Sequence, residues 1–235
     1  MTGRLLLIRH GESTANVAAA AAEAGGAEAI AVEARDADVP LSGLGERQAA
    51  TLAQALRDHA VSDAHVFSSP YRRAVQTAQA ADAEKPVLVL DERLRDRELG
   101  IIDALTVLGV ERRLPLEAER RRWLGKFYYR PPGGESWADV ALRVRSFLRD
   151  LPAGEGTAVI FTHDAVVSVF LFVLLGMTED ELHEFLRTRP VTNASVTVLA
   201  RSDDGWRVDA FADASHLTEV GLPATEHPGN ARADV

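Results

Sequence analysis

The sequence contains no cysteine among its 235 residues. Disulfide bonds, thiolate nucleophiles and cysteine-ligated zinc or iron–sulfur centres are therefore excluded. Long apolar runs are also missing, because the longest nearly apolar stretch, residues 165–175, falls well short of the ~20 residues that span a bilayer. The apolar run near the N-terminus, residues 5–8, is too short for the core of a secretion signal. We therefore expect a cytoplasmic protein with no membrane partner.

Positive charge is in short supply as well. The chain has 26 Lys and Arg residues against 35 Asp and Glu residues, a formal net charge of −9. Such a surface repels nucleic acids, so we expect no nucleic-acid partner. If the substrate is anionic, the protein must build a local cationic pocket against its own overall field. The apolar fraction of 46% and the charged fraction of 26% are ordinary for a globular protein.

Short apolar runs alternate with amphipathic stretches along the chain. The pattern predicts strands over residues 5–8, 65–67, 87–90 and 158–162, and helices over 45–59, 70–81, 135–151 and 165–175. A hairpin is predicted from residues 195–200 and 207–211 around Asp203-Asp204-Gly205. Strands that alternate with helices indicate an α/β sandwich whose sheet is mainly parallel.

The first segment with chemical potential directly follows the first predicted strand. It reads Arg9-His10-Gly11-Glu12-Ser13. A neutral imidazole is a good nucleophile, and its reference pKa of about 6.5 leaves it mostly neutral near pH 7. Arg9 is suited to hold phosphoryl oxygens in a bidentate fork. A structural histidine at a strand end is the alternative, and this motif alone does not decide between the two.

Three further segments lie at strand ends or helix starts. In the segment 69–78, Arg73 stands in the first turn of a predicted helix, where it either faces an anion or lies on the surface. His163 follows the strand 158–162 and either donates to a phosphoryl oxygen or is satisfied by a carboxylate. The segment 93–100 offers carboxylates between cations, either as a general acid or as a solvated charge run.

Together and in this order, these segments resemble the histidine phosphatase superfamily, in the branch of the cofactor-dependent phosphoglycerate mutases and their phosphatase relatives. Residues 38–49 and 133–136 resemble further parts of that family, so the similarity covers most of residues 4–200. The resemblance implies a three-layer α/β/α sandwich with a mainly parallel mixed sheet. It implies one domain over residues 1–220 with a cap inserted at about 101–132, and the remainder, 221–235, is predicted as a flexible tail.

The resemblance also implies roles for particular residues. His10 is the expected nucleophile, Arg9, Arg73 and His163 complete the phosphate pocket, and Asn16 is a further donor. The family places a carboxylate four residues before a glycine, and counting back from Gly100 selects Asp96 over Glu98 as the proton donor. The chemistry implied is hydrolysis of a phosphomonoester through a phosphohistidine, with no metal ion and no cofactor.

Two departures from the family pattern keep the proton donor open. The usual acid in this branch is glutamate, and Asp96 is one methylene shorter. The residue after the second histidine is usually glycine, whereas this chain has Asp164. The acid-phosphatase branch places an aspartate directly after that histidine and uses it as the proton donor. Asp96 is favoured, and Asp164 remains the alternative donor.

Three functions fit the resemblance. A phosphatase acting on a small phosphorylated metabolite is favoured, because residues 190–197 are similar to the phosphatase side of the branch. A phosphoglycerate mutase is the nearest alternative. A non-catalytic protein that binds phospho-ligands or partners is a third, although such proteins usually lack the histidine or its arginine partners. The expected assembly is a monomer or a homodimer.

The segment 111–130 differs in charge from the rest of the chain. It holds seven Lys and Arg residues against three Glu residues, with Trp123, Phe127, Tyr128 and Tyr129 among them. One interpretation is a solvated helix face with an aromatic inner side. The other is a lid that attracts an anionic metabolite and packs on its non-phosphate part.

Overall fold

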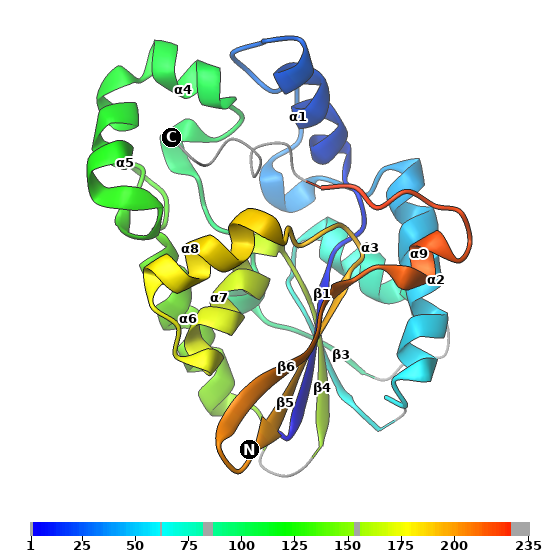
Figure 1. The fold of residues 1–235 in the computed structure, drawn as a ribbon. Coiled ribbons are helices and arrows are strands. Elements are labelled where there is room, and N and C mark those ends of the chain that lie inside the picture. Colours follow the sequence, from blue (N-terminus) through cyan, green and yellow to red (C-terminus); the bar gives the residue numbers. More distant parts are fainter. Residues whose placement is uncertain (1, 62, 82–86, 153–155, 227–235) are drawn as a thin grey trace.

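A computed structural model describes residues 2–61, 63–81, 87–152 and 156–226 of the chain. Its centre is a six-stranded sheet in the order β3-β2-β4-β1-β5-β6 (Figure 1). The strands are β1 (Arg4–Arg9), β2 (His65–Ser68), β3 (Leu88–Leu90), β4 (Thr157–Thr162), β5 (Val196–Ser202) and β6 (Gly205–Asp213). The first four are mutually parallel, while β5 runs antiparallel to β1 and forms a hairpin with β6. The predicted α/β fold with a mainly parallel mixed sheet is confirmed.

Alternating residues of β1 divide the core into two layers. Leu5 and Leu7 pack in one apolar cluster with α6 (Trp137–Asp150) and α7 (Asp164–Leu175). Leu6 and Ile8 point to the opposite face and pack with α2 (Gly43–Asp58) and α3 (Arg72–Ala81). All four side chains are fully buried, as the period of two in a strand requires when both faces are covered. Helices therefore cover both faces of the sheet, as Figure 1 shows.

The sequence-based element boundaries agree with the structure to within two residues. Local signals explain the agreement. The Ser42 hydroxyl accepts a hydrogen bond from Gly45 N and begins α2, and Ser136 and Asp139 form a capping box at α6. Such caps stabilise a helix by roughly 1 kcal/mol. At its other end α7 stops at Gly176, whose φ of 64° lies in the left-handed region that favours glycine.

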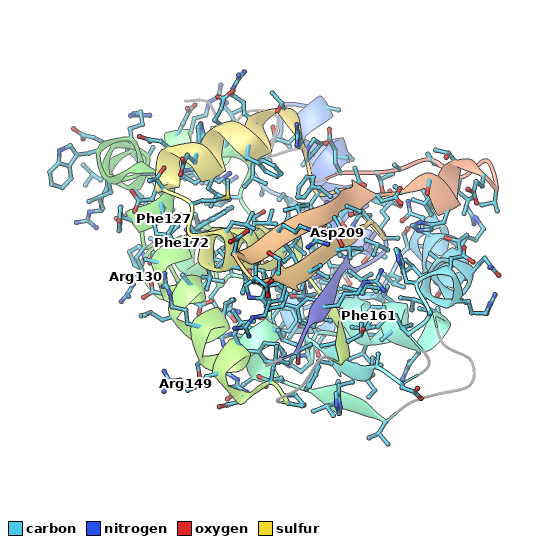
Figure 2. All side chains as sticks on the ribbon, turned by 60° about the horizontal axis from the view of Figure 1, so that its bottom comes forward. Phe127, Arg130, Arg149, Phe161, Phe172 and Asp209 are labelled. Atoms are coloured by element: carbon cyan, nitrogen blue, oxygen red, sulfur yellow. The ribbon has the colours of Figure 1, made fainter. Side chains whose placement is uncertain are left out.

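Helices outside the three layers surround the carboxyl ends of the parallel strands (Figure 1). They are α1 (Thr14–Ala24), α4 (Val107–Arg113), α5 (Pro115–Tyr128) and α8 (Glu179–Thr188), and a short α9 (Ser215–Thr218) packs beside α2. The segment predicted as a cap contains α4 and α5. Helix α5 is kinked at Gly125, whose φ of 74° and ψ of 161° are accessible essentially to glycine alone. Figure 2 shows Phe127, beyond this kink, beside Phe172 of α7, with ring centroids 4.7 Å apart.

The first residues of the segment predicted as a flexible tail are hydrogen-bonded to the rest of the domain. Thr225 O accepts a hydrogen bond from Asn193 N, and Pro223 O accepts one from the side chain of Gln48. Both partners are fully buried, so this part of the chain packs on the domain and departs from the expectation of a loose tail. Residues 227–235 of the predicted tail lie outside the described residues. In the described ranges no helix has the length and apolar character needed to cross a membrane.

Two glycines in the first turn of α2 provide a matched pair for testing the packing under the loop that follows β1. A Cβ at Gly45 would lie 1.9 Å from Glu12 O, whereas a Cβ at Gly43 meets nothing within 4 Å. We expect Gly45→Ala to lower the free energy of unfolding by about 1–3 kcal/mol or more through overpacking. Gly43→Ala should leave it unchanged or raise it by up to ~1 kcal/mol. Denaturant unfolding measures both, and equal effects would contradict the close contact.

Candidate active site

Three neighbouring parallel strands end at the same edge of the sheet and deliver the polar side chains of the site. His10 follows β1, His163 follows β4 and Ser69 follows β2. The two imidazole rings lie 5.1 Å apart, and Ser69 Oγ lies 2.9 Å from His163 Nε2. Arg73, from the first turn of α3, reaches the same point. The structure thus gathers His10, His163, Arg73 and Arg9, all of them buried.

The hydrogen bonds of His10 define its tautomer. Its Nδ1 lies 2.7 Å from Gly11 O, which only accepts, so Nδ1 carries the proton. Its Nε2 lies 3.2 Å from Nε of Arg73, which only donates, so Nε2 presents its lone pair. Burial, the cation of Arg73 and other nearby positive groups hold the pKa of His10 well below its ordinary value. The imidazole is therefore neutral, with Nε2 as its nucleophilic atom.

The guanidinium of Arg73 is surrounded by acceptors. Besides His10, its Nη1 donates to Asp36 O at 2.6 Å and lies 2.9 Å from Asp36 Oδ1. Its Nη2 lies 3.0 Å from Asp96 Oδ2. Burial opposes the charged form, but the two carboxylates outweigh it and raise the pKa of Arg73. Asp36 was not among the predicted site residues, because it lies in an irregular segment between α1 and α2 that matches no motif.

Arg9 has one donor without a protein acceptor. Its Nη1 donates to Val191 O at 2.5 Å, and its Nη2 lies 4.0 Å from Asp164 Oδ2. Its Nε is buried and makes no hydrogen bond within the described residues. A buried N–H is costly to leave unpaired, and Arg9 lines the same cavity as His10, so this N–H is a candidate contact for a ligand oxygen.

The carboxylate of Asp96 lies close to both Arg73 and His163. Its Oδ2 is 3.3 Å from His163 Nδ1 as well as close to Arg73, and its Oδ1 accepts from Arg97 N at 2.8 Å. Burial raises the pKa of Asp96, but Arg73 and the Arg97 N–H outweigh burial and lower it overall. For His163, burial and Arg73 hold the pKa well below its ordinary value, so both imidazoles of the site are neutral.

The other predicted site residues lie at the periphery. Asp164 begins α7, and its Oδ1 accepts from Ala165 N, while its charged neighbour is Arg9 rather than Arg73. Asn16 Oδ1 accepts from Ser13 N at 3.0 Å, so the amide oxygen is committed and its NH2 group is the part that can donate. Glu98 accepts a hydrogen bond from the Tyr71 hydroxyl at 2.8 Å.

A cavity of about 760 Å³ opens over these groups. Its polar end is lined by Arg9, His10, Arg73, Asp96 and Asp164. Its other walls come from α1, the segment before α2, residues 97–106, α4, α5, the start of α6 and α8, and they carry mainly apolar side chains. These include Ile30, Val32, Ile102, Val110, Leu124, Phe127, Trp137, Leu182 and Leu186. Within the described residues no cluster of three or more His, Asp or Glu side chains is arranged to hold a metal ion.

Some cations of the segment 111–130 lie on the surface, as a solvated helix face would have them, and others face the cavity, as a lid would have them. Arg112 and Arg113 pair with Glu28, and Arg130 pairs with Asp139, all on the surface. Arg121 and Lys126 instead line the cavity. Arg97 lines it too, and its guanidinium donates to the carbonyl oxygens of Glu135 and Tyr129. Burial and repulsion by Arg121 lower the pKa of Arg97 to about 10.

Comparison with known proteins gives one consistent family. The sequence model of the histidine phosphatase superfamily (branch 1) matches residues 5–214. A protein from Yersinia enterocolitica named "Probable phosphoglycerate mutase GpmB" is 30% identical over 230 residues, which is 93% of this chain and 97% of that protein. The solved structure of "Mycobacterial hydrolase 1" superposes with a TM-score of 0.72 at 28% identity, over 90% of this chain and 98% of its own. A mycobacterial glucosyl-3-phosphoglycerate phosphatase superposes with a TM-score of 0.70 at 26% identity, over 90% and 99%. The names of these relatives divide between mutase and phosphatase.

The protonation of the two site histidines is directly measurable. Because the pKa values of His10 and His163 are lowered, both rings should remain neutral at about pH 6, where an ordinary histidine is mostly protonated. Nitrogen-15 correlation spectra should show the Nδ1–H tautomer at His10. Assignments follow from His10→Asn and His163→Asn variants. A doubly protonated His10 ring at that pH would contradict the hydrogen-bond pattern.

Proposed function

The chain belongs to the histidine phosphatase superfamily, and from this premise we propose that it hydrolyses phosphate monoesters of small metabolites through a phosphohistidine at His10. The observation that carries the proposal is the lone pair of a neutral, buried His10 Nε2 beside the guanidinium of Arg73. A nucleophile that needs no deprotonation and faces a phosphate-binding cation suits attack on phosphorus. The side chains supply positive charge themselves, so the proposed reaction needs no metal ion and no cofactor.

In the first step, Nε2 of His10 forms a bond to phosphorus while the bond between phosphorus and the ester oxygen breaks. Arg9, Arg73 and His163 contact the non-bridging oxygens, where charge accumulates. The amide NH2 of Asn16 is a further donor to the same group. A carboxylic acid donates its proton to the departing oxygen. In the second step, water attacks the phosphohistidine, and the same carboxylate accepts a proton from that water.

Asp96 is the proposed acid because of where it lies. Its Oδ2 lies 3.0 Å from Nη2 of Arg73, the arginine that contacts His10, whereas Asp164 Oδ2 lies 4.0 Å from Nη2 of Arg9. Arg73 lowers the pKa of Asp96. A phosphoryl dianion shared on Arg73 works in the opposite direction and favours protonation of Asp96, since like charges raise the pKa of a carboxyl. Binding of the substrate thus raises the pKa of Asp96 and favours the protonated form that a proton donor needs.

The residues that line the cavity favour a substrate whose organic part carries a negative charge of its own. Arg97 and Arg121 both line the cavity and repel each other, and burial together with this repulsion lowers the pKa of Arg97 even though Asp96 and Glu135 oppose the decrease. A second acidic group on the substrate would relieve this repulsion. The apolar residues of α4 and α5 would cover the carbon skeleton. The phosphate moiety is held at the sheet edge and the remainder under the segment 101–132.

The nucleophile can be tested by substitution and by trapping. We expect His10→Asn to lose at least about a thousandfold in kcat, because it removes the nitrogen that the proposed reaction phosphorylates. His65→Asn, the same change at an exposed position, should keep full activity. A rapid alkaline quench should trap phosphohistidine in the unsubstituted enzyme. Full activity of His10→Asn, or failure to trap it, would overturn the mechanism.

The same enzyme preparation separates phosphatase from mutase activity. Incubated with 3-phosphoglycerate, a phosphatase releases inorganic phosphate, and a mutase yields 2-phosphoglycerate. Release of phosphate is the expected result, with a higher kcat/KM than for glycerol phosphate, which lacks the carboxylate. Formation of 2-phosphoglycerate without net phosphate release would assign the mutase reaction instead. Binding without either product would indicate the non-catalytic alternative.

The proton donor can be identified by how strongly the rate depends on the leaving group. An alkyl phosphate needs a proton on its departing oxygen, whereas p-nitrophenyl phosphate leaves readily without one. We expect Asp96→Asn to lower kcat on the alkyl ester by about 10²-fold or more and much less on the aryl ester. Asp164→Asn should affect both esters alike and only slightly. The opposite pattern would make Asp164 the donor.

A further inference from the structure

The carboxylate of Asp36 occupies the outer edge of the Arg73 guanidinium in a two-pronged contact. Its Oδ1 lies 2.9 Å from Nη1, and its Oδ2 accepts from Nη2 at 3.3 Å. This parallel arrangement is how arginine binds a carboxylate or a phosphate. With Nε on His10 and Nη2 also on Asp96, every nitrogen of Arg73 has a protein acceptor. An incoming phosphoryl group can contact this guanidinium only by taking over one of these positions.

Of the carboxylates around Arg73, Asp36 is the one that can yield. Asp96 is anchored by the backbone N–H of Arg97, which donates to its Oδ1 at 2.8 Å. Asp36 is more exposed, 38% against 24% for Asp96, and it lies in the single 3-10 turn η1 (Asp36–Asp38). No side chain caps that turn. Burial raises the pKa of Asp36 and Asp96 adds to the rise, even though Arg73 opposes it. The charged form of Asp36 is therefore held less firmly than that of Asp96.

We propose that Asp36 limits the affinity of the pocket for phosphoryl groups: its carboxylate occupies the position on Arg73 that a phosphoryl oxygen would take, and each phosphoryl ligand displaces it. The inference rests on the proposed function in so far as phosphate is the ligand of this pocket. Because the carboxylate competes for the same guanidinium and repels a dianion, it weakens binding of substrate and of inorganic phosphate alike. Its return to Arg73 favours departure of the phosphate formed after the phosphohistidine is hydrolysed.

The chain contains a matched control two residues away. Asp38 belongs to the same turn, but its carboxylate pairs with Arg35 at 2.7 Å and is 57% exposed. Asp36→Asn and Asp38→Asn each remove one negative charge from the same turn, so their long-range effects on an anion are nearly equal. Only the first removes the carboxylate that contacts Arg73. A difference between the two variants therefore reports the local competition and not the overall charge.

The test is calorimetric titration of inorganic phosphate into the unsubstituted protein and the two variants. We expect Asp36→Asn to lower the Kd for phosphate about tenfold, corresponding to a partly exposed carboxylate released from an arginine. Asp38→Asn should shift it by less than about twofold. Weaker or unchanged binding by Asp36→Asn would overturn the proposal, because Asp36 would then only orient Arg73. Asp36→Ala, which removes the whole carboxylate, should also bind phosphate more tightly if the asparagine variant folds poorly.

Steady-state kinetics provide an independent readout. In Asp36→Asn the KM should fall together with the inhibition constant of phosphate, while kcat stays equal or falls where phosphate release limits turnover. A large loss of kcat at unchanged KM would overturn the proposal, since it would make Asp36 part of the proton transfer. The proposed phosphatase function and the proposed competition at Arg73 can be contradicted separately. If the unsubstituted protein binds phosphate but hydrolyses no ester, the phosphatase function is contradicted, while the competition between Asp36 and phosphate for Arg73 is not.

Discussion

The hydrogen bond from Arg73 Nε to His10 Nε2 is the interaction on which the site depends. It requires the Nδ1–H tautomer of His10, which Gly11 O satisfies from the other side. It also brings a permanent positive charge beside the imidazole, which together with burial keeps the ring neutral. A buried guanidinium is stable only when its donors are paired, so the carboxylates of Asp36 and Asp96 are part of the same requirement. The neutral state and tautomer of His10 thus depend on Arg73, and the buried guanidinium of Arg73 depends on the two carboxylates.

The sheet order makes this arrangement possible. Strands β2, β4 and β1 are adjacent and parallel, so their carboxyl ends bring Ser69, His163 and His10 to one edge although they are far apart in the chain. Those strands were predictable, because residues 5–8 and 158–162 are continuous apolar runs typical of buried parallel strands. His10, Arg73 and His163 stood out because each follows a strand or opens a helix, but each alone also fitted a structural role. Only their order along the chain, which resembles the histidine phosphatase superfamily, grouped them as one candidate site.

The remaining parts lacked such a signal. Asp36, which pairs with Arg73, lies in the irregular segment between α1 and α2. Nothing in the periodicity of residues 25–41 indicates which of its carboxylates reaches the arginine. The bonds of Thr225 to Asn193 depend on where the chain returns after α9. Helix α8 is different: Thr178 and Glu181 form a capping box that is visible in the sequence, so its start could have been predicted. Long-range contacts of irregular segments require the three-dimensional structure, while caps and strands do not.

Charge distribution links the pocket to the rest of the molecule. The chain carries a net charge of −9, yet its buried cations at the sheet edge attract an anion. Within the pocket, the carboxylates of Asp36 and Asp96 together offset the single positive charge of Arg73 as long as no phosphoryl group is bound. When a dianion shares Arg73, the field of the arginine on Asp96 weakens and that of the phosphate opposes it, which moves the proton toward Asp96. The proposed displacement of Asp36 would remove its negative charge from the same guanidinium, so that more of the positive field of Arg73 acts on the phosphoryl oxygens. In the proposed reaction, Arg73 with Asp36 and Asp96 would in this way link the binding of phosphate to the protonation of Asp96.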